Sequence, residues 1–107
     1  MPVELRISVG TVPPAVEAAV YFVCAEALAN AAKHAEASSV RISVSQSSGR
    51  VFLMLVDDGV GGADLGKGSG LRGLADRVEA LSGQLSVQSP IGGGTRLDAT
   101  IPVGAQL

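Results

Sequence analysis

Residues 15–35 constrain the fold of this chain more than any other stretch. They contain neither Gly nor Pro, they are dense in Ala, and Pro13 and Pro14 before them suit the first turn of a helix. The pattern therefore predicts one long helix. A helix of this length must bury an apolar face against another element, so the remaining segments have to provide that surface.

Most other apolar residues alternate with polar ones in period two, which is typical of strands that expose one face. The predicted strands cover residues 3–9, 40–45, 51–56, 85–89 and 95–103. A second helix is predicted where apolar residues recur at helical spacing, and Gly83 supplies its C-terminal stop. Its spaced residues are Leu71, Leu74, Ala75, Val78 and Leu81.

The predicted order is β-α-β-β-loop-α-β-β, which has too few helices to cover both faces of a sheet. We therefore expect an α/β (α+β) two-layer sandwich, in which helices cover one face of a mixed, largely antiparallel sheet of about five strands. The chain has 107 residues and shows no linker or repeat, so we expect residues 1–107 to form a single domain.

Charge and composition narrow the function classes. Eight Lys and Arg are outnumbered by ten Asp and Glu and form no basic run, which argues against nucleic acid as a partner. The single cysteine, Cys24, has apolar neighbours, which predicts a buried thiol in a reducing compartment. No apolar run reaches the roughly 18 residues of a membrane span. We expect a soluble, cytoplasmic domain that makes no membrane contact itself, whether or not the full-length protein is membrane-bound.

The long predicted helix carries a polar stripe near its C-terminal end. Glu26, Asn30, Lys33 and His34 are spaced i, i+4, i+7 and i+8, which places them within roughly a 100° sector of the helix. One helix edge thus gathers an acid, an amide, an ammonium and an imidazole, and on its own such a stripe is more typical of a solvated face. The neighbouring sector, predicted to face the sheet, holds Val20, Cys24, Ala27, Leu28 and Ala31.

A second group of residues follows the apolar strand at 51–56. Asp57 stands at the strand end, and Gly59 and Gly61 come soon after it. A carboxylate fixed there can accept a hydrogen bond from an exocyclic amine, and glycines let the backbone approach a flat ring. In isolation the same segment is more typical of a plain Asp-Gly turn.

The third group opens the second predicted helix with Gly68, Gly70, Leu71 and Gly73. Free amides and the helix dipole at a helix N-terminus favour phosphate binding. The segment does not follow a strand of a βαβ unit and lacks Gly-Lys-Ser/Thr, which excludes a Rossmann dinucleotide site and a Walker A loop. Lys67 remains a candidate phosphate partner.

In this order and spacing, the three groups resemble the nucleotide-binding (Bergerat-type) fold shared by DNA gyrase, heat-shock chaperone ATPases, sensor histidine kinases and MutL-type repair proteins. Glu26-x-x-x-Asn30-x-x-Lys33-His34 looks like the N box, Asp57-x-Gly59-x-Gly61 like the first glycine box, and Gly68-x-Gly70-Leu71-x-Gly73-Leu74 like the second. The resemblance spans about residues 15–103. The pattern from Gly70 to Val78, with Leu81-Ser82-Gly83 and Gly94-Thr95, is especially similar to the nitrate-sensor-like subfamily of histidine kinases.

The resemblance implies an ATP and Mg²⁺ site. Asp57 would bind the adenine amino group, with Thr95 supporting it through a water, and Asn30 would ligate Mg²⁺. Glu26 would polarise the nucleophile, so Glu26 and Asn30 are the implied catalytic residues, and residues 62–69 would form a short lid. The implied ATP-binding set is Asn30, Lys33, His34, Asp57, Gly59, Gly61, Lys67, Gly68, Gly70, Leu71, Gly73 and Thr95.

The implied function is that of the catalytic domain of a two-component sensor kinase, which passes the γ-phosphoryl group of ATP to a histidine. That histidine would belong to a separate helical dimerisation and phospho-acceptor domain of the same kinase, with a response regulator served indirectly. The only histidine here, His34, lies in the N box, so autophosphorylation within this chain is not expected. Two alternatives stay open: a serine-directed anti-sigma-factor kinase of the same fold, and a module that binds a partner without nucleotide.

Overall fold

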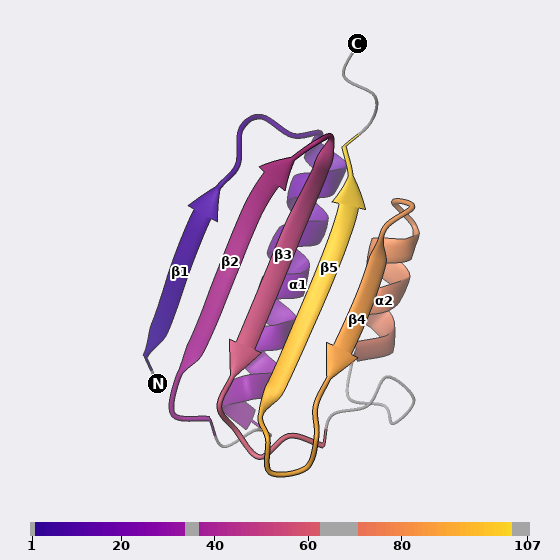
Figure 1. Cartoon of the computed structure of the whole chain (residues 1–107). Coiled ribbons are helices and arrows are strands. Elements are labelled where there is room, and N and C mark those ends of the chain that lie inside the picture. The colour runs from indigo at the N-terminus through magenta and orange to yellow at the C-terminus, as the bar shows by residue number, and fades with distance from the viewer. Residues whose placement is uncertain (1, 34–36, 63–70, 104–107) are drawn as a thin grey trace.

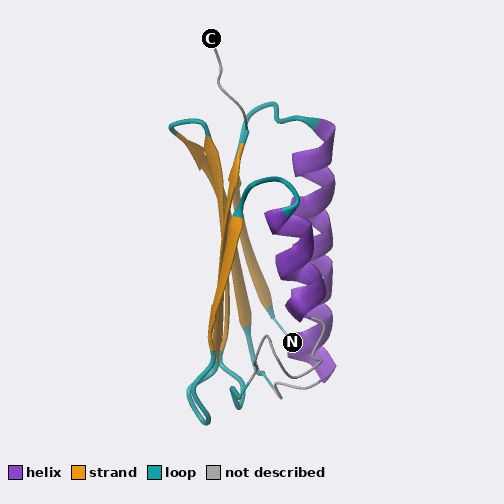
Figure 2. Cartoon of the chain, turned by 90° about the vertical axis from the view of Figure 1, so that its right-hand side faces the viewer, coloured by secondary structure: helices purple, strands orange, loops and turns teal. Residues whose placement is uncertain are grey.

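The computed structural model describes residues 2–33, 37–62 and 71–103. Its elements follow the expected order: β1 (Val3–Ser8), α1 (Pro14–Lys33), β2 (Val40–Ser47), β3 (Arg50–Asp57), α2 (Leu71–Glu79), β4 (Gln84–Gln88) and β5 (Thr95–Pro102). The five strands form one sheet in the order β1-β2-β3-β5-β4, with β1 parallel to β2 and the other pairs antiparallel. Both helices cover the same face of the sheet (Figures 1 and 2), which confirms the predicted two-layer sandwich.

The core lies between that face and the helices. The alternation of β2, β3 and β5 puts every second side chain inward, and both helices contribute one apolar stripe. Fully buried members include Val23, Ile42, Leu55, Leu74 and Leu97. Each such side chain contributes about 1.5–3 kcal/mol through its burial.

The stripe that α1 buries is rotated from the expected one. Val16, Ala19, Val23, Ala27 and Ala31 are buried, whereas Val20, Cys24 and Leu28 are only partly buried at its edge. The prediction of a buried Cys24 thiol is therefore only partly confirmed, because Cys24 packs against the core and is partly exposed. Burial is still sufficient to raise the pKa of this thiol.

Helix α1 is long and apolar enough to cross a membrane, contrary to the expectation that no segment of this sequence would be. Pro14–Ala32 has the length and mean hydropathy, 1.4, of a membrane-crossing helix. In this fold the same residues pack lengthwise on the sheet through the buried stripe, and 28% of the stretch is buried.

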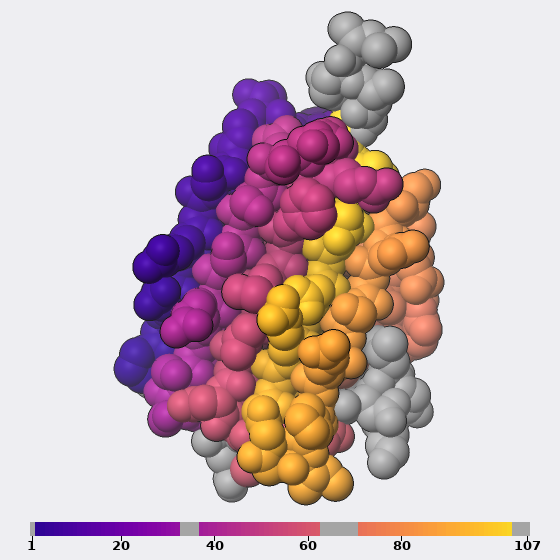
Figure 3. Space-filling model, viewed as in Figure 1, coloured from indigo at the N-terminus to yellow at the C-terminus, as the bar shows by residue number. Residues whose placement is uncertain are grey.

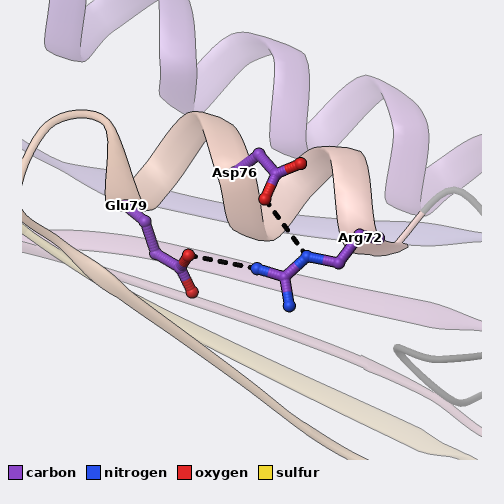
Figure 4. Close-up of polar contacts among 3 residues, drawn as sticks. All are labelled: Arg72, Asp76 and Glu79. Carbon is purple, nitrogen blue, oxygen red and sulfur yellow. Dashed lines mark hydrogen bonds and ion pairs between the residues drawn. The ribbon is translucent and has the colours of Figure 1, made fainter.

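Helix α2 packs beside α1 and carries charged residues on its outer side. The Arg77 guanidinium lies over the Phe22 ring of α1, with its carbon 3.7 Å from the ring centroid. Arg72 pairs with Asp76 (Nε to Oδ1, 3.1 Å) and with Glu79 (Nη2 to Oε1, 3.0 Å), as Figure 4 shows. Because these ion pairs are exposed, they contribute little to stability and mainly order the solvent side of the helix.

The end of α2 differs in detail from the expected glycine stop. Ser82 has the left-handed backbone (φ 63°), and its N–H donates to the Glu79 carbonyl over 2.9 Å. The N–H of Gly83 donates to the Val78 carbonyl, also over 2.9 Å, which completes a Schellman motif with Ser82 at the left-handed position. Gly83 is required for another reason, because a Cβ there would overlap the Thr100 carbonyl oxygen.

Strand β1 is more exposed than its alternating sequence predicts. All six of its residues are exposed, on both faces. Val3, Leu5 and Ile7 lie on the helix side, opposite the buried Val40, Ile42 and Val44 of β2. They remain exposed because α1 buries its stripe against the central strands, and at this edge of the sheet it stops short of covering β1.

Candidate functional site

Asp57 is the last residue of β3 and the one charged residue that is buried in the described part of the chain, at 6% exposure. It lies between two strands, opposite Val40 of β2 and Thr95 of β5. Its Oδ1 accepts the N–H of Gly59 over 2.9 Å. The carboxylate is therefore fixed at the end of a central strand before any ligand arrives.

Thr95 begins β5 directly beside Asp57, and a second hydroxyl holds it there. The Oγ atoms of Ser89 and Thr95 are 2.6 Å apart and hydrogen-bonded. Ser89 also donates to the Gly94 carbonyl over 3.4 Å. Sequence reasoning missed Ser89, because its link to Thr95 depends on how the turn between β4 and β5 folds back.

The segment after Asp57 packs onto that same turn. The N–H of Gly62 donates to the Ser89 carbonyl over 2.7 Å, and the N–H of Gly92 donates to the Val60 carbonyl over 2.6 Å. Gly61 (φ 70°) has no room for a side chain, because a Cβ would overlap the Pro90 carbonyl oxygen. This contact gives Gly61 a packing role independent of any bound ring.

Gly94 is a further residue that sequence reasoning did not place in the site. It has φ 75°, and a Cβ there would overlap the Asp57 carbonyl oxygen. Glycine is thus what allows the start of β5 to lie against the end of β3, where Asp57 and Thr95 meet.

Asp58 connects this strand end to the chain that leaves α1. Its Oδ1 accepts the N–H groups of Ser38 (2.8 Å) and Ser39 (3.0 Å). Its Oδ2 accepts the hydroxyls of Ser38 and Ser39, the latter over 3.3 Å. These four hydrogen bonds, which we call the Asp58 clasp, tie residues 38–39 to the residue that follows Asp57. The hydrogen bond from the Ser38 hydroxyl, and then those from the Ser39 and Ser38 N–H groups, lower the pKa of the Asp58 carboxyl to about 2.

The Asp58 clasp makes stability depend on acid pH. Because the folded-state pKa lies below the ordinary value, the clasp contributes fully above about pH 4 and loses its contribution as the pH falls toward 2. We expect the unfolding free energy of the wild type to fall more steeply with acid than that of Asp58→Asn, as measured by urea unfolding between about pH 5 and pH 2.

A serine variant provides the matched comparison. Replacing Ser38 and Ser39 together by Ala removes two of the four donors and should also flatten the pH dependence, whereas Ser86→Ala at an exposed position of β4 should not. Parallel curves for the wild type and Asp58→Asn would contradict the role of the clasp.

The polar stripe of α1 lies on the last turns of that helix. Asn30 is half-buried and Glu26 is exposed, one turn earlier. Lys33 ends the helix, and its side chain, like His34, Lys67, Gly68 and Gly70, lies outside the described residues. The predicted lid at 62–69 lies outside them too, except for Gly62.

The second glycine box is described from Leu71 onward. Leu71 begins α2 and is 3% exposed, so it anchors the first turn in the core. Gly73 is exposed, and a Cβ there would meet nothing within 4 Å among the described residues. Packing among the described residues therefore gives no reason for a glycine at this position.

These elements converge at one end of the molecule. The C-terminal ends of α1 and β3, the start of α2 and the start of β5 all lie at the lower end in Figure 1. The fold thus brings the three sequence groups together: a polar helix end, a buried carboxylate at a strand end, and the N-terminus of a second helix. That combination is the one expected of a nucleotide-binding site of the two-layer ATPase type.

Comparison with known proteins agrees with this class. Residues 15–105 match the family described as histidine kinase-, DNA gyrase B- and HSP90-like ATPase. The chain belongs to this ATP-binding family, and within it corresponds to the catalytic ATPase domain of sensor histidine kinases.

Curated relatives from Bacillus subtilis (strain 168) include several histidine kinases. The chain is 36% identical over 94 residues to the sensor histidine kinase YdfH, covering 81% of this chain and 23% of the relative. It is 34% identical over 97 residues to the signal transduction histidine-protein kinase/phosphatase DegS, covering 84% of this chain and 25% of the relative. The chain therefore spans about a quarter of the length of these relatives.

Solved structures show the same fold. The blue-light activated histidine kinase of Erythrobacter litoralis EL346 superposes with a TM-score of 0.76 at 26% identity, over 97% of this chain and 36% of that one. The ATP-binding domain of PrrB from Mycobacterium tuberculosis has a TM-score of 0.65 at 25% identity, over 94% of this chain and 82% of that one.

Proposed function

We propose that this domain binds Mg-ATP and transfers its γ-phosphoryl group to a histidine on a separate helical domain of the same kinase, which then serves a response regulator. The observation that carries the proposal is the buried Asp57 held beside Thr95, at the end of the sheet where α1 ends and α2 begins. The sensor kinase relatives support it, and we place the domain on the cytoplasmic side of its sensor.

Asp57 accepts the adenine amino group in this proposal. A carboxylate only accepts hydrogen bonds, so it selects an amino purine over a purine that carries a carbonyl at the same position. Thr95, held by Ser89, positions a water between its hydroxyl and the base. Gly59 and Gly61 shape the backbone beside the ring.

The first turn of α2 holds the phosphates through its free N–H groups. Gly73 supports this role, because a Cβ there would meet no described residue within 4 Å, so packing within the described part of the chain does not require a glycine. We propose that Lys33, His34, Lys67, Gly68, Gly70 and Leu71 complete the phosphate side of the site. The pattern from Gly70 to Val78 further supports membership of the nitrate-sensor-like subfamily.

Glu26 and Asn30 supply the catalytic groups. Asn30 offers a side-chain oxygen, the kind of donor that Mg²⁺ prefers, so this part of α1 fits a magnesium site completed by phosphates and water. Asn30 holds the metal, which neutralises phosphate charge when bound. Glu26, exposed one turn earlier, orients the attacking group. The two alternatives raised by the sequence gain no support from the sensor kinase relatives.

Titration calorimetry tests this proposal through the metal. We expect the wild type to bind Mg-ATP, and Asn30→Asp to alter the Mg²⁺ dependence of ATP binding more than it alters the binding of metal-free ADP. Equal effects of Asn30→Asp on both ligands would assign Asn30 a structural role, and the absence of any heat with either ligand would overturn nucleotide binding.

Gln46→Glu is the matched control for this substitution, because it also converts an amide into a carboxylate. Gln46 lies on β2 at the end opposite Val40, the residue that pairs with Asp57. Its Oε1 accepts the N–H of Gly10 over 2.9 Å, a bond that a glutamate oxygen can keep. The control should therefore add a negative charge far from the site and leave the Mg²⁺ dependence of ATP binding unchanged.

A further inference from the structure

The outer edge strand of the sheet, β1, exposes three large apolar side chains. Val3, Leu5 and Ile7 of β1 are 47%, 56% and 63% exposed. β1 pairs only with β2, and no element of the described chain lies along its other side (Figures 1 and 3). Exposed apolar edge strands are templates for pairing with another chain, and proteins usually protect them.

An apolar groove continues inward from this edge. It has a volume of about 440 Å³ and lies between β1 and α1, whose Tyr21 is 76% exposed beside it. Val20 and Cys24 line its helix side. Edge and groove together form a continuous apolar surface at the end of the sheet opposite β4.

The backbone of β1 has hydrogen-bonding groups available at this edge. The Val40 N–H donates to the Pro2 carbonyl over 3.0 Å, which identifies the residues of β1 whose backbone groups bond to β2. Residues of a strand direct their N–H and C=O groups alternately to its two sides. Pro2, Glu4 and Arg6 therefore face β2, and Val3, Leu5 and Ile7 direct theirs outward.

The sequence of β1 is self-complementary when two copies run antiparallel. Pairing centred on Leu5 places Leu5 opposite Leu5 and Val3 opposite Ile7, as hydrogen-bonded pairs. It also places Glu4 of each copy opposite Arg6 of the other, in the non-hydrogen-bonded positions where side chains approach most closely. Glu4 and Arg6 already lie on one face and pair within the strand at 3.3 Å, so both charges are in place.

We propose that β1 is an interface through which two copies of this chain pair their edge strands antiparallel, forming a continuous ten-stranded sheet across a two-fold axis at Leu5. The backbone bonds and the apolar residues on the helix side hold the two copies together. The Glu4 and Arg6 pairs select the register, since exposed ion pairs add little strength. The proposal goes beyond nucleotide binding and does not depend on it.

Charge exchange gives a direct test by analytical ultracentrifugation. The wild type should sediment as a monomer–dimer equilibrium. Glu4→Arg puts Arg opposite Arg, and Arg6→Glu puts Glu opposite Glu, so each variant alone should dimerise at least roughly ten-fold more weakly. Mixing the two variants restores opposite charges at both positions and should restore a heterodimer, which native mass spectrometry identifies by its mass.

The mixing experiment separates pairing from misfolding. Within the chain, Glu4→Arg loses the ion pairs of Glu4 with Arg6 and Arg41, and Arg6→Glu loses only the pair of Glu4 with Arg6. Mixing the two variants repairs neither loss. Leu5→Pro provides a second test: it removes an outward N–H and no bond to β2, so it should abolish dimers while circular dichroism stays unchanged. A wild type that stays monomeric at all concentrations, or single variants that dimerise as it does, would overturn the proposal.

Discussion

Replacing Asp57 by Asn is expected to weaken ATP binding by about 1.5–3 kcal/mol, which is roughly 10- to 150-fold in Kd. The substitution exchanges a charged acceptor for an amide at the buried end of β3. The Asn side chain can keep the bond from the Gly59 N–H through its oxygen. Its NH₂ group then faces the adenine amino group, donor against donor. Titration calorimetry with ATP and GTP measures the effect.

Asp98→Asn is the matched control for this substitution. Asp98 lies on the neighbouring strand β5, away from the proposed base site, and its Oδ2 is 2.9 Å from the Arg96 Nε. Replacing it by Asn makes the same chemical change. It should leave ATP affinity unchanged. Unchanged ATP affinity in Asp57→Asn, or GTP that competes equally with ATP in the wild type, would contradict the assignment of Asp57 to the base.

The sequence predicts the sheet and the position of Asp57 because both depend on local patterns. Alternation identifies the strands, and the end of an apolar run places a carboxylate at a strand terminus. The wide turn before Thr95 predicts a hairpin with the preceding strand. The adjacency of Thr95 and Asp57 depends on the order of the strands, which these local patterns do not specify. The family resemblance implies this adjacency, and the pairing of β3 with β5 shows it.

Other features depend on contacts that no local pattern specifies. The partners of Asp58 lie 19 and 20 residues earlier, so its clasp is visible only once the end of β3 meets the segment after α1. The exposure of β1 and the partial burial of Cys24 both follow from where α1 packs on the sheet. A period-two pattern shows which side chains share a face, and it does not show whether a helix reaches that face.

The glycines also differ in whether the sequence or only the structure explains them. The sequence marks Gly61 as a residue that lets a ring approach, and the structure adds its contact with the Pro90 carbonyl. Gly94 is likewise explained by packing, because a Cβ there would overlap the Asp57 carbonyl oxygen. In contrast, a Cβ at Gly73 would meet no described residue within 4 Å, which agrees with the ligand contact proposed for this glycine.

The largest effect that we expect concerns phosphoryl transfer. The chain alone, mixed with radiolabelled ATP, should give no acid-labile phosphoprotein, because the family resemblance assigns its only histidine, His34, to the N box. Adding the cognate dimerising helices as a second polypeptide should place label on their histidine, slowly, because covalent linkage no longer supplies a high effective concentration. Label on a serine of a sigma-factor antagonist would favour the serine kinase, and stable label on His34 would refute its place in the N box.

In that reconstituted reaction, Glu26→Gln is expected to slow transfer by about 10²-fold or more, the usual range for loss of a positioned acid or base, while ATP affinity stays nearly unchanged. A group that acts mainly in the transition state has this signature, because its interaction is absent from the bound ground state. Glu17→Gln is the matched control: Glu17 is an exposed glutamate in the first turn of the same helix, at the end away from Asp57. It should transfer at the wild-type rate. If both variants lose transfer equally, or if Glu26→Gln loses ATP affinity in the same proportion as its rate, then Glu26 acts in binding or folding and the transfer chemistry resides elsewhere in the site.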